Sequence, residues 1–141
     1  MLNITIINGP NLNLLGKREP GIYGNESFED FLVQLKQAFP QVNFTYFQSN
    51  VEGELVNAIQ QYGFNQDGMI INPAAYTHTS VAIGDAIASI QTPVIEVQQY
   101  TCSRRFQKNI TCLCKSSWFH CWLRLKGILS CYNMVCRSSC K

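Results

Sequence analysis

The sequence predicts an α/β fold built on a doubly wound parallel sheet, and three features lead to this prediction. Short apolar segments rich in β-branched residues alternate with segments of helical period along residues 1–97. The links between them are short, as in strand–helix–strand units. Polar residues also gather directly after the predicted strands, where α/β folds place their chemistry. With 141 residues, 46% of them hydrophobic, the chain has enough material for one domain with a real core.

Four strands are expected. Leu2–Asn8 is apolar, β-branched and free of charge, and Val42–Phe47 alternates between apolar and polar residues. Gly68–Asn72 and Val94–Val97 are short and apolar, as central strands of a parallel sheet are. We expect all four strands to lie in one sheet.

Three helices are expected between these strands. The first begins after Ser27, which opens a capping-box pattern, and stops at Pro40. The second covers Glu52–Tyr62 and ends at Gly63, a common stop residue. The third covers Thr79–Ile90.

The composition changes sharply near Val97. Residues 1–97 carry 3 Lys or Arg against 9 Asp or Glu, whereas residues 98–141 carry 8 Lys or Arg and no acid. All seven cysteines also lie in residues 98–141. We therefore divide the chain into an α/β domain, residues 1–97, and a Cys-rich basic tail, residues 98–141.

No segment of the sequence is long and apolar enough to cross a membrane, and the N-terminus lacks a signal-peptide pattern. We therefore expect a cytoplasmic protein with no membrane partner.

A polar loop follows the first strand and spans Asn8–Gly24, with the sequence NGPNLNLLGKREPGIYG. It lacks both glycine patterns of phosphate-binding loops, so the usual nucleotide-binding sites are excluded here. It offers instead an amide at Asn11, a cation at Arg18 and a phenol at Tyr23. Such a loop serves either as part of an active site or as an ordinary solvated surface loop.

A second polar stretch follows the third strand and contains Asn72, His78, Thr79 and Ser80. Its hydroxyls, and the amides that open the next helix, are suited to binding an anion. Helix capping explains Thr79 or Ser80 equally well, and a lone histidine such as His78 is often structural.

Two acidic residues complete the candidates. Glu96 lies near the end of the fourth strand, where it is either functional or a plain strand-end charge. Asp85 interrupts the apolar run of the third helix. It is therefore either buried and paired, or projects across a subunit boundary.

These motifs together resemble the type II 3-dehydroquinate dehydratases. The resemblance covers residues 1–97 and rests on three stretches at matching separations: the loop NGPNLNLLGKREPGIYG, the strand end FQSN and the segment INPAAYTHTSVAIGDAI. It implies a flavodoxin-like fold, and a dodecamer built from trimers. It also implies cofactor-free dehydration of 3-dehydroquinate to 3-dehydroshikimate by anti elimination through an enolate. This lyase serves the shikimate pathway of aromatic amino acid biosynthesis or quinate catabolism, and the residues do not distinguish the two.

The resemblance also assigns roles. Tyr23 is the base, and because a neutral tyrosine with a pKa near 10 is a poor base at pH 7, Arg18 would stabilise its anion. A shift of two pKa units needs about 2.7 kcal/mol, which a desolvated cation can supply. Asn11 would hold the water that stabilises the enolate. The substrate hydroxyls and carboxylate would be bound by Asn72, His78, Thr79 and Ser80.

Asp85 would serve the site of a neighbouring subunit, and Glu96 would orient the general acid of the reaction. In the family that acid is a histidine two residues after this glutamate, but here the position holds Gln98. Glutamine cannot donate the proton, and the family's substrate-binding arginine further along is also unmatched. We therefore expect impaired activity; the alternative is an inactive ligand-binding or scaffold homologue.

The genetic code suggests why the resemblance stops. With a suitable choice of synonymous codons, the codons of residues 98–108 read one nucleotide later can encode Ser-Asn-Ile-His-Ala-Arg-Glu-Asp-Phe-Arg. This is the missing family segment. The codons of Trp118 and Trp122 then force glycines where the family has them. We hypothesise a frameshift at codon 98 that replaces the last strand and helix of the fold with a poorly ordered tail. The sheet would then lose its fifth strand.

The tail has two other interpretations, a metal site and a nucleic-acid-binding segment. It contains no Cys-x-x-Cys, and structural zinc sites usually show ligands paired at short, regular spacing. Its aromatic residues lie among scattered cations, a pattern that is common in proteins of many functions. We expect no metal, no cofactor and no nucleic-acid partner, only a small-molecule substrate and further copies of the chain.

Overall fold

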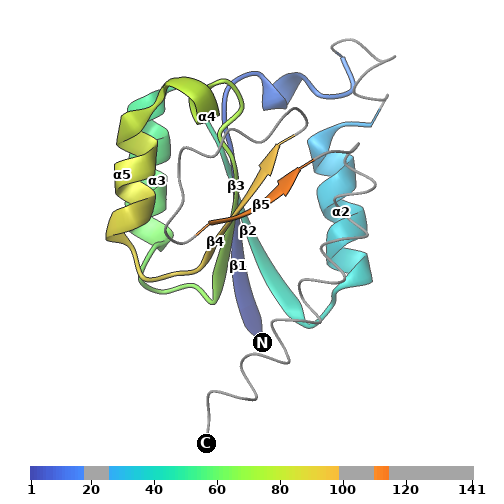
Figure 1. The fold of residues 1–141 in the computed structure, drawn as a ribbon. Helices are drawn as coiled ribbons and strands as arrows, with labels where there is room; N and C mark the ends of the chain where they lie inside the picture. Colours follow the sequence, from blue (N-terminus) through green and yellow to red (C-terminus); the bar gives the residue numbers. More distant parts are fainter. Residues whose placement is uncertain (18–25, 99–109, 115–141) are drawn as a thin grey trace, which may run out of the picture.

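The computed structural model describes residues 1–17, 26–98 and 110–114. These residues form one parallel sheet with strand order β2-β1-β3-β4-β5. Figure 1 shows helix α2 on one side of the sheet and helices α3 and α5 on the other. The predicted fold class, a doubly wound α/β sheet, is confirmed.

The strands are β1 Leu2–Asn8, β2 Val42–Gln48, β3 Gly68–Asn72, β4 Val94–Gln98 and β5 Ile110–Cys114. The four strands expected from the sequence are all present, and two of them extend one residue further than predicted. In β3 every residue is buried, as its apolar sequence indicated.

The fifth strand differs from expectation, because we expected the sheet to end at β4. Instead β5, which comes from the tail, pairs in parallel with β4 from Val94 opposite Ile110 to Gln98 opposite Cys114. Its sequence ITCLC is short and apolar, as a strand in an α/β sheet requires. It pairs with backbone groups on the outer edge of β4 that would otherwise lack a sheet partner.

The helices are α2 Phe28–Ala38, α3 Glu52–Tyr62, α4 Tyr76–Thr79 and α5 Val81–Ser89, and a 3₁₀ turn, η1, covers Leu12–Leu14. Within the described ranges, no helix has the length and apolar character needed to cross a membrane.

Helix α2 begins where the sequence predicts. The Ser27 hydroxyl accepts a hydrogen bond from the Asp30 backbone N–H at 3.1 Å and donates one to the Asp30 carboxylate at 2.7 Å. The cap therefore satisfies a free N–H group of the first turn.

The predicted third helix is wrong in its first turn. Ser80 has an extended backbone, with φ −89° and ψ 106°, so it separates α4 from α5. Its hydroxyl accepts a hydrogen bond from the Ile83 N–H at 2.9 Å and caps α5. His78 and Thr79 consequently lie in the short helix α4, outside α5.

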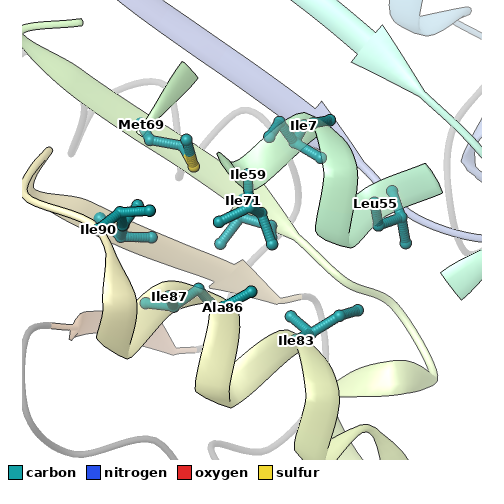
Figure 2. Packing of buried hydrophobic residues seen from close by; sticks show 11 residues of the cluster. Ile7, Leu55, Ile59, Met69, Ile71, Ile83, Ala86, Ile87 and Ile90 are labelled. Atoms are coloured by element: carbon teal, nitrogen blue, oxygen red, sulfur yellow. The ribbon is translucent and has the colours of Figure 1, made fainter. Parts of the chain in front are cut away.

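The sheet separates two apolar cores. Side chains alternate across β1, so Ile6 packs in the core beneath α2 and Ile7 packs in the core beneath α3 and α5. Figure 2 shows the second core, in which strand residues face α3 and α5. Its labelled members are Ile7, Leu55, Ile59, Met69, Ile71, Ile83, Ala86, Ile87 and Ile90.

Gly63 ends α3 for a different reason than the usual glycine stop. Its φ is −73°, so it does not adopt the left-handed conformation that favours glycine. A β-carbon at Gly63 would lie 2.2 Å from Cγ2 of Ile90 and 2.7 Å from the Ile59 carbonyl oxygen. Glycine is required because α3 and the end of α5 pack too closely for any side chain.

Replacement of two glycines near the ends of α3 tests this packing. Gly63→Ala should lower the free energy of unfolding by about 1–3 kcal/mol, because the methyl group overpacks the core. Gly53→Ala is the matched control, since no atom lies within 4 Å of a β-carbon there. It should leave stability unchanged or raise it by about 0.4–1 kcal/mol. Urea unfolding measures both, and equal effects of the two substitutions would contradict this explanation.

Candidate active site

The candidate site begins with three polar residues aligned across the sheet. Strand register places Asn8 of β1 beside Gln48 of β2 on one side and Asn72 of β3 on the other. All three residues end their strands, so they share the C-terminal edge of the sheet. This is the edge at which open α/β sheets bind their ligands.

A close backbone contact joins the loops that leave β1 and β3. The Gly9 N–H donates a hydrogen bond to the Asn72 carbonyl oxygen at 2.8 Å. A β-carbon at Gly9 would lie 2.7 Å from the carbonyl oxygen of Pro73. Any residue other than glycine would therefore push apart the two loops that carry most of the candidate residues.

The two loops also have unusual backbone conformations. Asn11 has φ 66°, in the left-handed region that asparagine tolerates better than most residues. The Asn72 side chain accepts a hydrogen bond from the Ala74 N–H at 3.1 Å, and Ala74 itself has φ 53°. The Asn72 carboxamide thus holds a tight turn directly before α4.

Asn8 is fully buried, with 0% of its surface exposed. Its amide group donates a long hydrogen bond, 3.5 Å, to the hydroxyl of Tyr46, whose ring stacks on Phe28 at the start of α2. Among the described residues no group donates to the Asn8 carboxamide oxygen. Burial raises the pKa of Tyr46; the Asn8 hydrogen bond lowers it and the nearby Glu29 raises it. Tyr46 therefore stays neutral near pH 7.

Glu96 is a buried carboxylate, only 4% exposed. Thr77, which is 1% exposed, donates a hydrogen bond from its hydroxyl to Oε1 of Glu96 at 2.8 Å. Burial raises the pKa of Glu96, and the Thr77 hydrogen bond and the positive potential of His78 oppose this in part. Glu96 is thus more than a strand-end charge, because its carboxylate is held in a fixed position between β4 and α4.

The remaining candidates divide by position. His78 and Thr79 are exposed on α4, whereas Ser80 is buried and caps α5 as described above. Asp85 is exposed on α5, so the structure excludes the prediction that it is buried within its own chain. Arg18 and Tyr23 lie outside the described residues, as does the side chain of Gln98.

No group of three or more His, Cys, Asp or Glu residues gathers into a possible metal site within the described part of the chain.

Comparison with known proteins identifies the family. The sequence model of the family described as "Dehydroquinase class II" matches residues 2–115, well over half of the chain. The chain belongs to the class II dehydroquinase family. The match reaches 18 residues past Val97 and includes β5, so the family extends further along this chain than the three motifs indicated.

Individual 3-dehydroquinate dehydratases are identical to this chain at about half of the aligned positions. The 3-dehydroquinate dehydratase of Campylobacter lari is 53% identical over 106 residues, which cover 74% of this chain and 66% of that protein. The corresponding protein of Aliarcobacter butzleri is 48% identical over 115 residues, covering 78% and 70%. The chain therefore spans about two thirds of the length of these relatives.

Solved structures agree with the fold. The type II dehydroquinase of Butyrivibrio crossotus superposes with a TM-score of 0.64 at 46% identity, covering 68% of this chain and 69% of that one. A 3-dehydroquinate dehydratase-like protein of Bifidobacterium longum covers 96% of this chain and 98% of its own at 20% identity, with a TM-score of 0.62. The second likeness supports the fold alone.

Sequence reasoning missed Thr77 as the partner of Glu96. It also noted the strand end FQSN only as part of a motif, and assigned no contact to Gln48 or Asn50. No local signal marks these residues, because each contact joins elements that are distant in the chain. These residues come together only in the folded chain, where α4 packs near β4 and the segment after β2 lies beside the loop after β1.

The raised pKa of Glu96 predicts a particular pH dependence of stability. The folded protein retains the Glu96 proton at pH values where the unfolded chain has lost it, so stability falls as pH rises from about 4.3 through the folded pKa. Glu96→Gln keeps an oxygen for Thr77 but does not titrate. The free energy of unfolding of Glu96→Gln, minus that of the parent chain, should therefore increase over this pH range and then level off.

Urea unfolding of both proteins between pH 4 and pH 8 measures the difference. Thr77→Val is the companion variant, since loss of its hydroxyl removes a group that lowers the Glu96 pKa and should move the upper limit of the range to higher pH. A constant difference between Glu96→Gln and the parent chain across this range would contradict the assignment.

Proposed function

We propose that this chain binds 3-dehydroquinate at the C-terminal edge of β1, β3 and β4 and abstracts a proton next to its ketone. Dehydration to 3-dehydroshikimate then follows slowly, because the proton donor of the second step is missing. The proposal rests mainly on the contact between Gly9 and Asn72, which brings the two loops with family motifs to one edge of the sheet. The chemistry needs no cofactor.

The first half of the reaction is assigned to the loop after β1. Tyr23 is the base, and Arg18 stabilises its phenolate so that it can accept a proton near neutral pH. Asn11 holds the water that stabilises the negative oxygen of the enolate. The support for this assignment is the position of the loop: the Gly9 N–H donates to the Asn72 carbonyl oxygen at the end of β3, and the Asn11 N–H donates to the Asn50 carboxamide oxygen just after β2.

Substrate binding is assigned to the stretch after β3. His78 and Thr79 are exposed on α4, so their side chains are accessible to the hydroxyls and carboxylate of a substrate. The Ser80 hydroxyl accepts the N–H of Ile83, but a hydroxyl can accept and donate at the same time. Asn72 contributes through its amide and through the turn that it holds.

Asp85 is assigned to the site of a second copy of the chain. Its exposed position on α5 is compatible with that role, since other residues of the helix, Ile83, Ala86 and Ile87, pack in the core beneath α3 and α5. This assignment implies a homo-oligomer, which in this family we expect to be a dodecamer built from trimers.

The second half of the reaction lacks its acid. Glu96 is held in place to orient a neighbour, but the residue two positions later is Gln98, whose amide does not donate a proton at neutral pH. Loss of a general acid typically slows a reaction about 10²–10⁴-fold. The same substitution favours a second candidate function, an inactive homologue that binds the ligand or acts as a scaffold.

Restoring the acid distinguishes these functions. Gln98→His should raise the dehydration rate by about tenfold or more, because a positioned imidazole can protonate the leaving hydroxyl. The rate is measured by the ultraviolet absorption of the conjugated carbonyl in the product. Gln91→His is the matched control, since this exposed residue precedes β4 at the opposite edge of the sheet and should change nothing.

Tyr23→Phe, made in the Gln98→His chain, should abolish the gain. If neither the parent chain nor Gln98→His dehydrates the substrate, the enzyme assignment is wrong and the binding or scaffold function replaces it.

We also propose that residues 98–141 are translated in a shifted reading frame. The absence of acidic residues, the seven cysteines and the change at Gln98 support this proposal together, whereas the family match through residue 115 is the observation against it. Sequencing the natural transcript across codons 95–130 tests it. We expect a change of a few nucleotides to restore the histidine and the arginines, whereas an intact natural frame that encodes this tail would overturn the proposal.

A further inference from the structure

The starting observation is the strained backbone of Asn11. This residue has φ 66° and ψ 0°, a conformation that is unfavourable in residues other than glycine, although asparagine tolerates it best. The conformation persists only if neighbouring groups stabilise it. Asn11 is exposed, so core packing does not provide that stabilisation.

Hydrogen bonds to the end of β2 provide it instead. The Asn50 carboxamide oxygen accepts a hydrogen bond from the Asn11 backbone N–H at 2.9 Å. The same oxygen accepts one from Nε2 of Gln48 at 3.2 Å, which fixes its direction. Gln48 also donates to the Gly9 carbonyl oxygen at 3.3 Å. The end of β2 therefore holds the loop after β1 at Gly9 and at Asn11.

Asn50 also contacts the other loop of the site. Its backbone carbonyl oxygen accepts a hydrogen bond from the Tyr76 hydroxyl at 3.2 Å, and Tyr76 is the first residue of α4. One residue thus connects Asn11 with the helix that carries His78 and Thr79. A displacement of Asn50 would alter the position of Asn11 relative to the substrate-binding stretch.

We propose that Asn50 is a positioning residue for enolate formation, a role that rests on the function proposed above. Its carboxamide oxygen holds the Asn11 N–H, and this bond keeps Asn11 in the left-handed conformation from which its side chain holds the enolate-stabilising water. Without the bond, the loop relaxes toward negative φ and the Asn11 side chain turns away. The enolate lies on the path to elimination, so a less stable enolate slows dehydration whichever half of the reaction limits the rate.

Three single substitutions in the full chain test the proposal. Asn50→Ala removes the acceptor, whereas Asn50→Asp keeps an oxygen for both donors. Asn65→Ala is the control, because Asn65 is an exposed asparagine between α3 and β3, at the opposite edge of the sheet. We expect kcat for the residual dehydration of 3-dehydroquinate to fall about tenfold or more in Asn50→Ala, with KM changed by less than about threefold.

Asn50→Asp should retain most of the parental kcat, and Asn65→Ala should retain all of it. A parental kcat in Asn50→Ala would overturn the proposal, and so would an Asn50→Asp chain as slow as Asn50→Ala.

A second measurement needs no turnover. Hydrogen exchange of the Asn11 backbone amide, followed by NMR in the ligand-free chain, should be faster in Asn50→Ala than in the parent and near the parental rate in Asn50→Asp. If the parent chain shows no dehydration, the proposed function fails separately. The hydrogen-exchange rate of the Asn11 backbone amide is then the only test of the positioning role. An unchanged rate in Asn50→Ala overturns that role.

Discussion

The contact between Gly9 and the Asn72–Pro73 backbone is the constraint on which the rest of the site depends. One hydrogen bond of 2.8 Å and the absence of a β-carbon allow the loops after β1 and β3 to approach each other. The strands beneath them are fixed by the two cores, which bury both faces of β1. A rigid pair of strands, joined at their ends, can hold polar groups against a ligand without further reorganisation.

The sequence predicted the fold well where the signal was local. Apolar, β-branched runs located β1 to β4, and the cap at Ser27 located the start of α2. The prediction from sequence failed at the start of the third helix, where one residue has two possible roles. Ser80 can continue a helix or cap one, and only the extended backbone of the folded chain shows that it caps α5. We did not expect β5, because the change in charge and cysteine content after Val97 indicated that the sheet ends at β4.

The candidate site was predictable in its residue types but not in its contacts. Asn11, Asn72 and Glu96 were found from their places at or just after the C-terminal ends of strands. The partners Asn50 and Thr77 follow from tertiary geometry: Asn50 is 39 residues from Asn11, and Thr77 is 19 residues from Glu96. Ala74 is a local partner, two residues after Asn72. The restriction at Gly63 was also hidden, since its φ is ordinary and only the position of Ile90 explains it.

The two halves of the proposed chemistry depend on different parts of the chain. In the proposed mechanism, residues before Val97 would supply the base and the enolate site, and the acid would belong to position 98, which holds glutamine. The most direct test follows 3-dehydroquinate in deuterated water by proton NMR and compares deuterium uptake next to the ketone with formation of 3-dehydroshikimate. Our account predicts that deuterium enters the substrate several times faster than product forms, because the enolate is reprotonated before water leaves. Product formation as fast as deuterium uptake, or no uptake above that of buffer, would contradict it.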